Sequence, residues 1–251
     1  MDNKDLIIED LLKSNVLWGK KLVVCGDSFT EGDFSGFCDS EGRKGKDSPL
    51  IYDSEMGVYK TYPWWIAKRN HMRLKNLAKC GGTIALTQKH LSSPDTVPPT
   101  DHTPFSYQTY ETVEADADYI LIMYGLNDMY NCALGDINDE TNETFLGAWN
   151  VVLRHLITEH PMAKIGTIVS NAYLSDAFAN AIRAVSRKWG IPYLDLMEDA
   201  SVSSTLYKKG MCKEAEEIRN ARFYVTPENH HPNHLAHEFI STAVEAFLRS
   251  L

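Results

Sequence analysis

Two residues far apart in this 251-residue sequence could together transfer an acyl group. Ser28 stands in the segment GDSFTEG, directly after the short apolar run KKLVVC. His231 stands in ENHHPN, just before an amphipathic stretch at the end of the chain. A serine hydroxyl becomes a nucleophile when a base reaches it, and a histidine can be that base near neutral pH. Taken alone, GDS is more typical of a simple turn.

Two further segments could supply hydrogen-bond donors to a developing oxyanion. The sequence NLAKCGGT contains Gly81, and a glycine leaves its backbone N–H unobstructed. We choose Gly81 over the adjacent Gly82 by counting from Asn76. The sequence YGLND contains Asn127, whose side-chain amide is another candidate donor. Taken alone, NLAKCGGT is more typical of a tight turn, and YGLND could also be a turn cap.

Three acidic residues lie next to these candidates. Glu228 precedes His231 by three positions, and a carboxylate there could fix the imidazole tautomer and stabilise the imidazolium. Asp27 and Asp128 follow a glycine and an asparagine in their loops. We expect both to be structural, because aspartates in such positions accept hydrogen bonds from nearby backbone N–H groups.

The pattern of the chain explains how these segments could meet. Short apolar runs typical of buried strands lie at 20–25, 74–77, 119–123, 165–169 and 191–194, and helical patterns lie at 5–17, 62–71, 142–159, 174–189, 212–220 and 232–251. Strands that alternate with helices predict a parallel sheet covered on both faces, with ligands at the carboxyl edge. The sequence therefore predicts one α/β domain over 1–251, with polar surface insertions near 33–60, 91–108 and 201–225.

Composition narrows the class of protein further. Hydrophobic residues are 43% and charged residues 24% of the chain, which is typical of a folded globular domain. A formal charge of -9 with no basic run disfavours nucleic acid as a partner, and no segment approaches membrane-spanning length. The five cysteines are scattered and form no CxxC pair, which disfavours a disulfide framework or a thiolate zinc site. We expect a cytoplasmic protein, with phage association or release by lysis left open, and predict no oligomeric state.

The combination of GDSxTxG, NxAxxG, GxND and HPN, in this order, resembles the SGNH hydrolases, the GDSL-type esterases and lipases. The resemblance runs from Lys21 to about Leu248. It implies a flavodoxin-like three-layer α/β/α sandwich with a five-stranded parallel sheet, and no cofactor. It also implies that Ser28 is the nucleophile, that His231 is the general base, and that Asn127 and the Ser28 and Gly81 N–H groups form the oxyanion hole.

The chain departs from the family where the third triad residue is expected. The family usually has Asp three residues before the histidine, and this chain has Glu228. We take Glu228 as the third member and keep a Ser–His dyad oriented by a backbone carbonyl as the alternative. We also expect activity to rise as His231 loses its proton, near or somewhat above the ordinary histidine pKa of about 6.5.

Several functional alternatives stay open. The substrate expected is a small-molecule or carbohydrate ester with a short acyl or O-acetyl group, and a lysophospholipase or thioesterase is also compatible with the resemblance. A metal-dependent hydrolase could use the cluster His230, His231, His234 and His237. A non-catalytic carbohydrate-binding module could use the aromatic residues Tyr62, Trp64, Trp65, Tyr124 and Tyr130, although we interpret the two tryptophans as core residues of a helix.

Overall fold

A five-stranded parallel sheet forms the centre of the computed structural model, which describes residues 14–86, 104–198 and 208–251. Its strands are β1 (Lys21–Gly26), β4 (Arg73–Asn76), β5 (Tyr119–Met123), β6 (Lys164–Val169) and β7 (Tyr193–Asp195). They lie in the order β4-β1-β5-β6-β7, and every neighbouring pair is parallel. This is the flavodoxin-like order, so the predicted fold class is confirmed.

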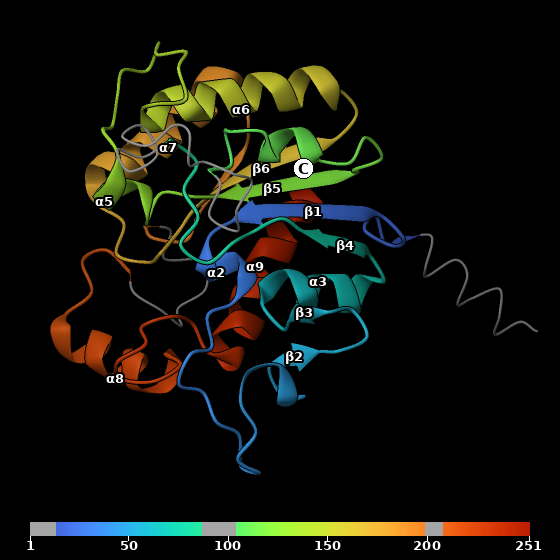
Figure 1. Ribbon diagram of the computed structural model, residues 1–251, viewed down its shortest axis with the longest axis vertical. Coiled ribbons are helices and arrows are strands. Elements are labelled where there is room, and N and C mark those ends of the chain that lie inside the picture. Colours follow the sequence, from blue (N-terminus) through green and yellow to red (C-terminus); the bar gives the residue numbers. More distant parts are fainter. Residues whose placement is uncertain (1–13, 87–103, 199–207) are drawn as a thin grey trace, which may run out of the picture.

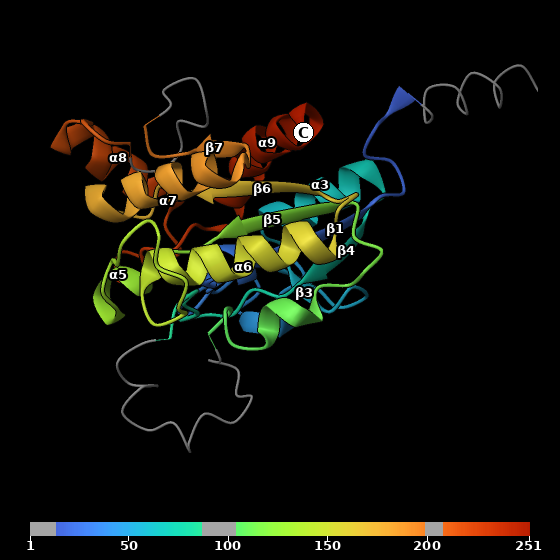
Figure 2. The ribbon, with the colours of Figure 1, turned by 90° about the horizontal axis from the view of Figure 1, so that it is seen from above.

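Helices cover both faces of the sheet, as Figures 1 and 2 show. On one face lie α6 (Phe145–Glu159) and α7 (Asp176–Trp189), and on the other lie α3 (Tyr62–Asn70) and α9 (His234–Ser250). Strands buried on both faces must be apolar throughout, which explains the uninterrupted YILIM of β5.

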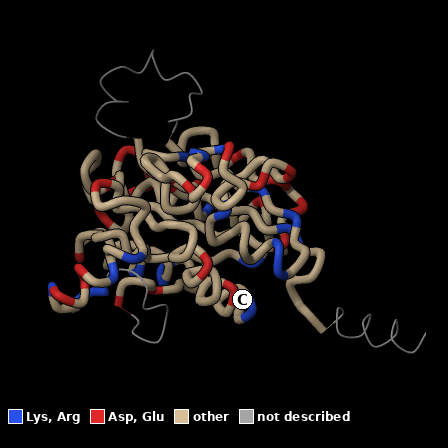
Figure 3. The backbone as a smooth tube through the Cα atoms, turned by 90° about the horizontal axis from the view of Figure 1, so that it is seen from below, with Lys and Arg blue, Asp and Glu red and all other residues tan. Residues whose placement is uncertain are grey.

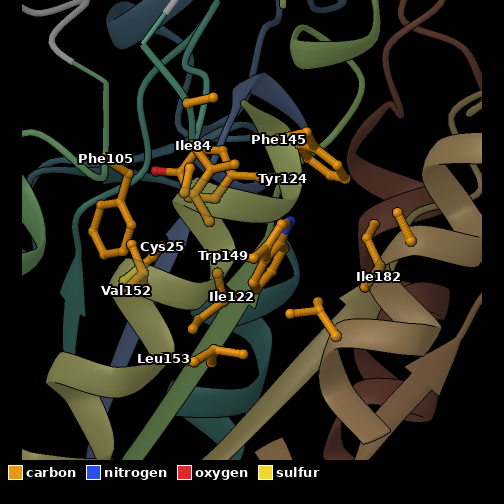
Figure 4. Close-up of a cluster of buried hydrophobic side chains, with 14 of the residues drawn as sticks. Cys25, Ile84, Phe105, Ile122, Tyr124, Phe145, Trp149, Val152, Leu153 and Ile182 are labelled. Carbon is orange, nitrogen blue, oxygen red and sulfur yellow. The ribbon is translucent and has the colours of Figure 1, made fainter. Parts of the chain in front are cut away.

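Two hydrophobic clusters, one on each side of the sheet, make up the core. In β1, Val23 and Cys25 point into the cluster under α6 and α7, whereas Leu22 and Val24 point into the cluster under α3 and α9. Figure 4 shows the first cluster around Trp149, which is completely buried. Burial on both faces fixes the register of the central strands, and therefore the positions at which their carboxyl ends leave the sheet.

The predicted helices that cover the sheet are present, but three of them begin later than expected. The α6 helix begins at Phe145 rather than at 142, because the Thr144 side chain accepts a hydrogen bond from the Gly147 N–H and caps the first turn. The α7 helix begins at Asp176 rather than at 174. The α9 helix begins at His234, where Asn233 caps it and leaves Pro232 outside.

The insertions contain small elements of their own. Residues 33–60 form the 3-10 helix η1 (Gly45–Asp47) and a hairpin of β2 (Tyr52–Asp53) and β3 (Val58–Tyr59). The polar region near the third insertion contains α8 (Lys213–Phe223), close to the predicted 212–220 helix. The chain also forms η3 (Thr109–Thr112) and the short helices α2 (Ser28–Glu31) and α5 (Asp128–Asn131). Most of the predicted helix at 5–17, and parts of the insertions at 91–108 and 201–225, lie outside the described residues.

The described part of the chain has no helix that is both long and apolar enough to cross a membrane. Figure 3 shows its acidic and basic positions interspersed around the molecule.

Candidate active site

Ser28 is held just beyond the carboxyl end of the interior strand β1 by the start of α2. The Asp27 side chain accepts a hydrogen bond from the Phe29 N–H at 2.9 Å and caps this four-residue helix. The Asp27 residue therefore has the structural role predicted for it. Ser28 itself is the first helical residue, and only 6% of it is exposed.

His231 reaches Ser28 from the loop that precedes α9. The Ser28 Oγ and His231 Nε2 atoms lie 2.7 Å apart in a hydrogen bond. Asn233 fixes the beginning of α9, since its Oδ1 accepts from the Ala236 N–H and its Nδ2 donates to the Arg222 and Tyr224 carbonyls. The structure thus brings together the predicted nucleophile and base, although 203 positions separate them in the sequence.

The other imidazole nitrogen contacts a residue that the sequence analysis did not identify. His231 Nδ1 lies 2.6 Å from Asn229 Oδ1, and Asp33 Oδ2 lies 3.9 Å from the same nitrogen. Glu228, the expected third member, lies among the described residues but has no hydrogen bond to His231; its backbone N–H donates to Thr226 Oγ1. Sequence spacing gave no signal for Asn229 or Asp33, because the comparison with the family motif pointed to the position three residues before the histidine.

The two other candidate oxyanion donors lie in the loops that follow β4 and β5, the strands on either side of β1. Gly81 has a φ of 74°, a conformation that glycine adopts readily, and its N–H has no acceptor in the described part of the chain. The adjacent Gly82 N–H donates to the Lys79 carbonyl at 2.8 Å, so the turn uses it. Asn127 Nδ2 donates to the Gly82 carbonyl at 3.0 Å, which leaves its second amide hydrogen for another acceptor.

Asp128 links the loop after β5 to the loop after β4 by hydrogen bonds. Its buried carboxyl group accepts hydrogen bonds from the Ile84 and Ala85 N–H groups at 3.0 Å, which confirms its predicted structural role. Burial raises the pKa of Asp128 to about 7 and the pKa of Asp27 to about 7.

A cavity of about 850 Å³ opens over Ser28 and His231. Its walls come from the loops after β1, β4, β5 and β6, from α8, and from the loop before α9. They are lined by Ser28, Phe29, Asp33, Cys80, Gly81, Leu126, Asn127, Tyr130, Ala172, Tyr173, Glu216, Asn220, Glu228, Asn229, His230 and His231. The cavity is large enough for a small-molecule substrate.

The pKa of His231 corrects one expectation. Burial lowers this pKa below the ordinary value of 6.5, and it outweighs the opposite effect of the Asp33 charge. The pKa was expected near or somewhat above 6.5, and that was wrong because desolvation disfavours the charged imidazolium.

The four histidines named as a metal cluster do not converge. His230 stacks on Tyr224 with ring centroids 5.0 Å apart, and His237 is buried between α9 and α3. The described residues hold no group of three His, Cys, Asp or Glu side chains that could bind a metal ion.

The aromatic residues named for a carbohydrate platform also separate. Tyr62, Trp64 and Tyr124 are buried, which for Trp64 agrees with the interpretation as a core residue. Trp65 is half-buried, and Tyr130 is exposed and lines the cavity. One of the five is therefore placed to contact a substrate beside Ser28.

Comparison with known proteins gave structural relatives alone. No protein-family model matches the sequence, and no curated protein matches it. A crystal structure of a Lactobacillus plantarum protein superposes with a TM-score of 0.64 at 22% identity, covering 93% of this chain and 98% of that one. A protein from Bacteroides ovatus assigned as a GDSL-like lipase has a TM-score of 0.61 at 20% identity, covering 93% of this chain and 100% of that one.

A family-two carbohydrate esterase from Clostridium thermocellum, solved with cellohexaose, has a TM-score of 0.55 at 13% identity. This chain covers 64% of that protein, and 92% of this chain is matched. The chain has the fold of the SGNH hydrolases, which confirms the resemblance at the level of the fold.

Proposed function

We propose that this protein is a serine esterase that hydrolyses acyl esters at Ser28. The observation that carries the proposal is the 2.7 Å hydrogen bond between Ser28 Oγ and His231 Nε2 at the floor of an open cavity. A nucleophile in hydrogen-bond contact with a base, which is itself oriented by a third group, is the arrangement that acyl transfer requires. Structural relatives assigned as lipases and esterases support the same chemistry.

The reaction has two acyl transfers. His231 Nε2 takes the Ser28 proton while Oγ bonds to the ester carbonyl carbon, and the Ser28 N–H, Gly81 N–H and Asn127 amide stabilise the oxyanion. The carbon–oxygen bond to the alcohol then breaks, and His231 returns the proton to that alcohol. Water attacks the acyl-enzyme in the same way, releasing the carboxylic acid and restoring Ser28.

The substrate proposed is a short acyl or O-acetyl ester of a polar or carbohydrate alcohol. The cavity lining includes the polar side chains Glu216 and Asn220 of α8 and Glu228, which could hydrogen-bond the hydroxyl groups of a polar alcohol. The carbohydrate esterase from Clostridium thermocellum shares the fold. A lysophospholipase or thioesterase would instead favour long acyl chains.

The test compares wild type with Ser28→Ala on p-nitrophenyl acetate, butyrate and octanoate, with Ser54→Ala, an exposed serine, as matched control. We expect Ser28→Ala to lose essentially all hydrolysis while its circular dichroism spectrum stays that of wild type. The Ser54→Ala control should behave as wild type, and acetate should be the best substrate.

Two results would overturn parts of the proposal. Hydrolysis that survives Ser28→Ala but disappears with a chelator would move the chemistry to a metal site. A rate that increases toward octanoate would replace the short-chain esterase by a lipase or lysophospholipase.

A further inference from the structure

We propose that Asn229, supported by Asp33, holds His231 in the tautomer that accepts the Ser28 proton, in the role that sequence comparison gives to Glu228. The inference rests on the proposed esterase function. Both residues are positioning residues, because they act on the reaction through the imidazole of His231.

The orientation of the Asn229 amide is fixed from both ends. The His231 backbone N–H donates to one amide atom at 3.1 Å, so that atom must be the oxygen. The other amide atom lies 2.9 Å from the Ser35 carbonyl oxygen, so that atom must be the nitrogen. The assignment Oδ1 toward His231 and Nδ2 toward Ser35 therefore follows from groups whose donor and acceptor roles cannot change.

The tautomer of His231 follows from this orientation. Its Nδ1 atom lies 2.6 Å from Asn229 Oδ1, which can only accept, so Nδ1 carries the hydrogen. In the neutral ring, Nε2 is then the unprotonated nitrogen, and it is the atom that faces Ser28 Oγ at 2.7 Å. A neutral amide thus selects the tautomer required for proton transfer from the serine.

Asp33 supplies the negative charge that the amide lacks. Burial tends to raise the pKa of Asp33, but hydrogen bonds from Ser35 and Asn229 and the attraction of His231 outweigh it and lower the pKa below its usual value. The Asp33 carboxylate accepts from Asn229 Nδ2 at 3.3 Å through Oδ1, while its Oδ2 lies 3.9 Å from His231 Nδ1. It can therefore stabilise the imidazolium formed during acyl transfer.

Other groups around His231 do not take over this role. His230 lowers the pKa of His231, so it does not stabilise the imidazolium. Burial lowers the pKa of His237 to about 3. The Phe29 ring, which is apolar, packs against the imidazole with the ring centroids 5.4 Å apart. Glu228 lies on the wall of the same cavity without a hydrogen bond to the imidazole within the described residues.

The kinetic test compares Asn229→Ala, the double variant Asn229→Asp/Asp33→Asn and Glu228→Gln, with Asn138→Ala in an exposed loop as control. We expect Asn229→Ala to lower kcat for p-nitrophenyl acetate about 100-fold with little change in KM, since the base is no longer held in place. The double variant Asn229→Asp/Asp33→Asn restores an acceptor for His231 without placing two carboxylates side by side, and it should recover most of kcat. A larger loss of kcat in Glu228→Gln than in Asn229→Ala would overturn the proposal.

An independent readout follows the His231 ring resonances by NMR as a function of pH. Asp33→Asn keeps the Asn229 acceptor but removes the charge, so the His231 midpoint should move to lower pH. Asn229→Asp/Asp33→Asn moves the single charge into direct contact with Nδ1, so the midpoint should move to higher pH. An unchanged midpoint in both variants would contradict the proposal. This titration needs no activity, so it still tests the positioning if wild type cuts no ester and the proposed function fails.

Discussion

In the proposed mechanism Ser28 loses its proton to His231 only while the imidazole is neutral, so the environment of this one side chain would set the working pH. Burial lowers the pKa of His231 below 6.5, and the neutral base is present above that pKa. We expect kcat/KM for p-nitrophenyl acetate to rise with pH and to reach half its maximum below pH 6.5. A pH–rate profile measures this directly, and a half-maximum above 6.5 would contradict the assignment of burial as the dominant effect.

Residue identities in the site were predictable from the sequence only where a residue type carries the chemistry. Ser28 and His231 were predicted because their motifs, taken with the two others, resemble those of the SGNH hydrolases, and the structure brings the two side chains into contact. Asn229 and Asp33 were missed, because orienting an imidazole needs only an acceptor at the right place. Many residue types supply an acceptor. The position of the Asn229 acceptor depends on how the loops that contain Thr226 and Ser35 fold, because both residues hydrogen-bond to Asn229.

Among the elements, the start of α9 helps to position the site, because His231 lies three residues before it. Asn233 caps this helix and also binds the carbonyls of Arg222 and Tyr224 at the end of α8. We expect Asn233→Ala to lower the free energy of unfolding by about 1–2 kcal/mol and to reduce kcat by displacing His231. Urea denaturation and ester hydrolysis give the two measurements.

Ser175→Ala provides the matched control, because Ser175 occupies the N-cap of α7 without a side-chain capping bond. This variant should lose clearly less stability than Asn233→Ala and keep its activity. Equal losses in the two variants would show that the hydrogen bonds of Asn233 are not what stabilises the start of α9.

The elements themselves followed closely from apolar periodicity. The β5 strand spans the predicted 119–123, because a short run of five apolar residues is typical of a strand buried on both faces. Helix starts were less predictable. The side chains of Thr144 and Asn233 cap α6 and α9 by hydrogen bonds, and the spacing of apolar residues does not indicate where such bonds form. The α2 helix was missed because four residues are too few to show a period.

At the scale of the whole molecule, stability should respond to acid through a histidine outside the reaction. His237 packs between α9, α3 and the 33–60 insertion, with the Phe34 and Tyr62 rings 5.9 and 6.5 Å away, and burial lowers its pKa to about 3. Below pH 6.5 the unfolded chain binds a proton at this position that the folded protein does not bind. As the pH falls from 6.5 toward the lowered pKa of about 3, His237 therefore removes stability, by roughly 1 kcal/mol per pH unit.

Comparison with His237→Gln isolates this effect, because the Gln side chain does not titrate. It is needed because Asp27 and Asp128, with pKa values raised to about 7, have the opposite effect and favour the folded protein as the pH falls below 7. Between pH 6.5 and 5, denaturation should show wild type losing about 2 kcal/mol more than His237→Gln. His71→Asn, at an exposed histidine, should follow wild type, and parallel curves for wild type and His237→Gln would contradict the prediction.

The class of fold could be predicted as a whole, whereas the shape of the cavity could not. Alternating strands and helices allow few other arrangements than a parallel sheet with helices on both faces, and the order β4-β1-β5-β6-β7 agrees with that expectation. The cavity wall at α8 depends on contacts between segments far apart in the sequence, such as the hydrogen bond from the Tyr173 hydroxyl, in the loop after β6, to Glu216 in α8. Such contacts follow from the folded arrangement and not from a local pattern.

The central claim is that Ser28 carries the acyl group, and trapping that intermediate tests it most directly. Wild type is mixed with p-nitrophenyl acetate, quenched in acid within the first turnovers, digested and analysed by mass spectrometry, with Ser28→Ala treated in parallel. We predict one acetyl group on the peptide that contains Ser28 in wild type and none on the same peptide in the variant. Ester cleavage by wild type together with an acetyl group on another residue, or equal labelling of both proteins, would contradict the claim.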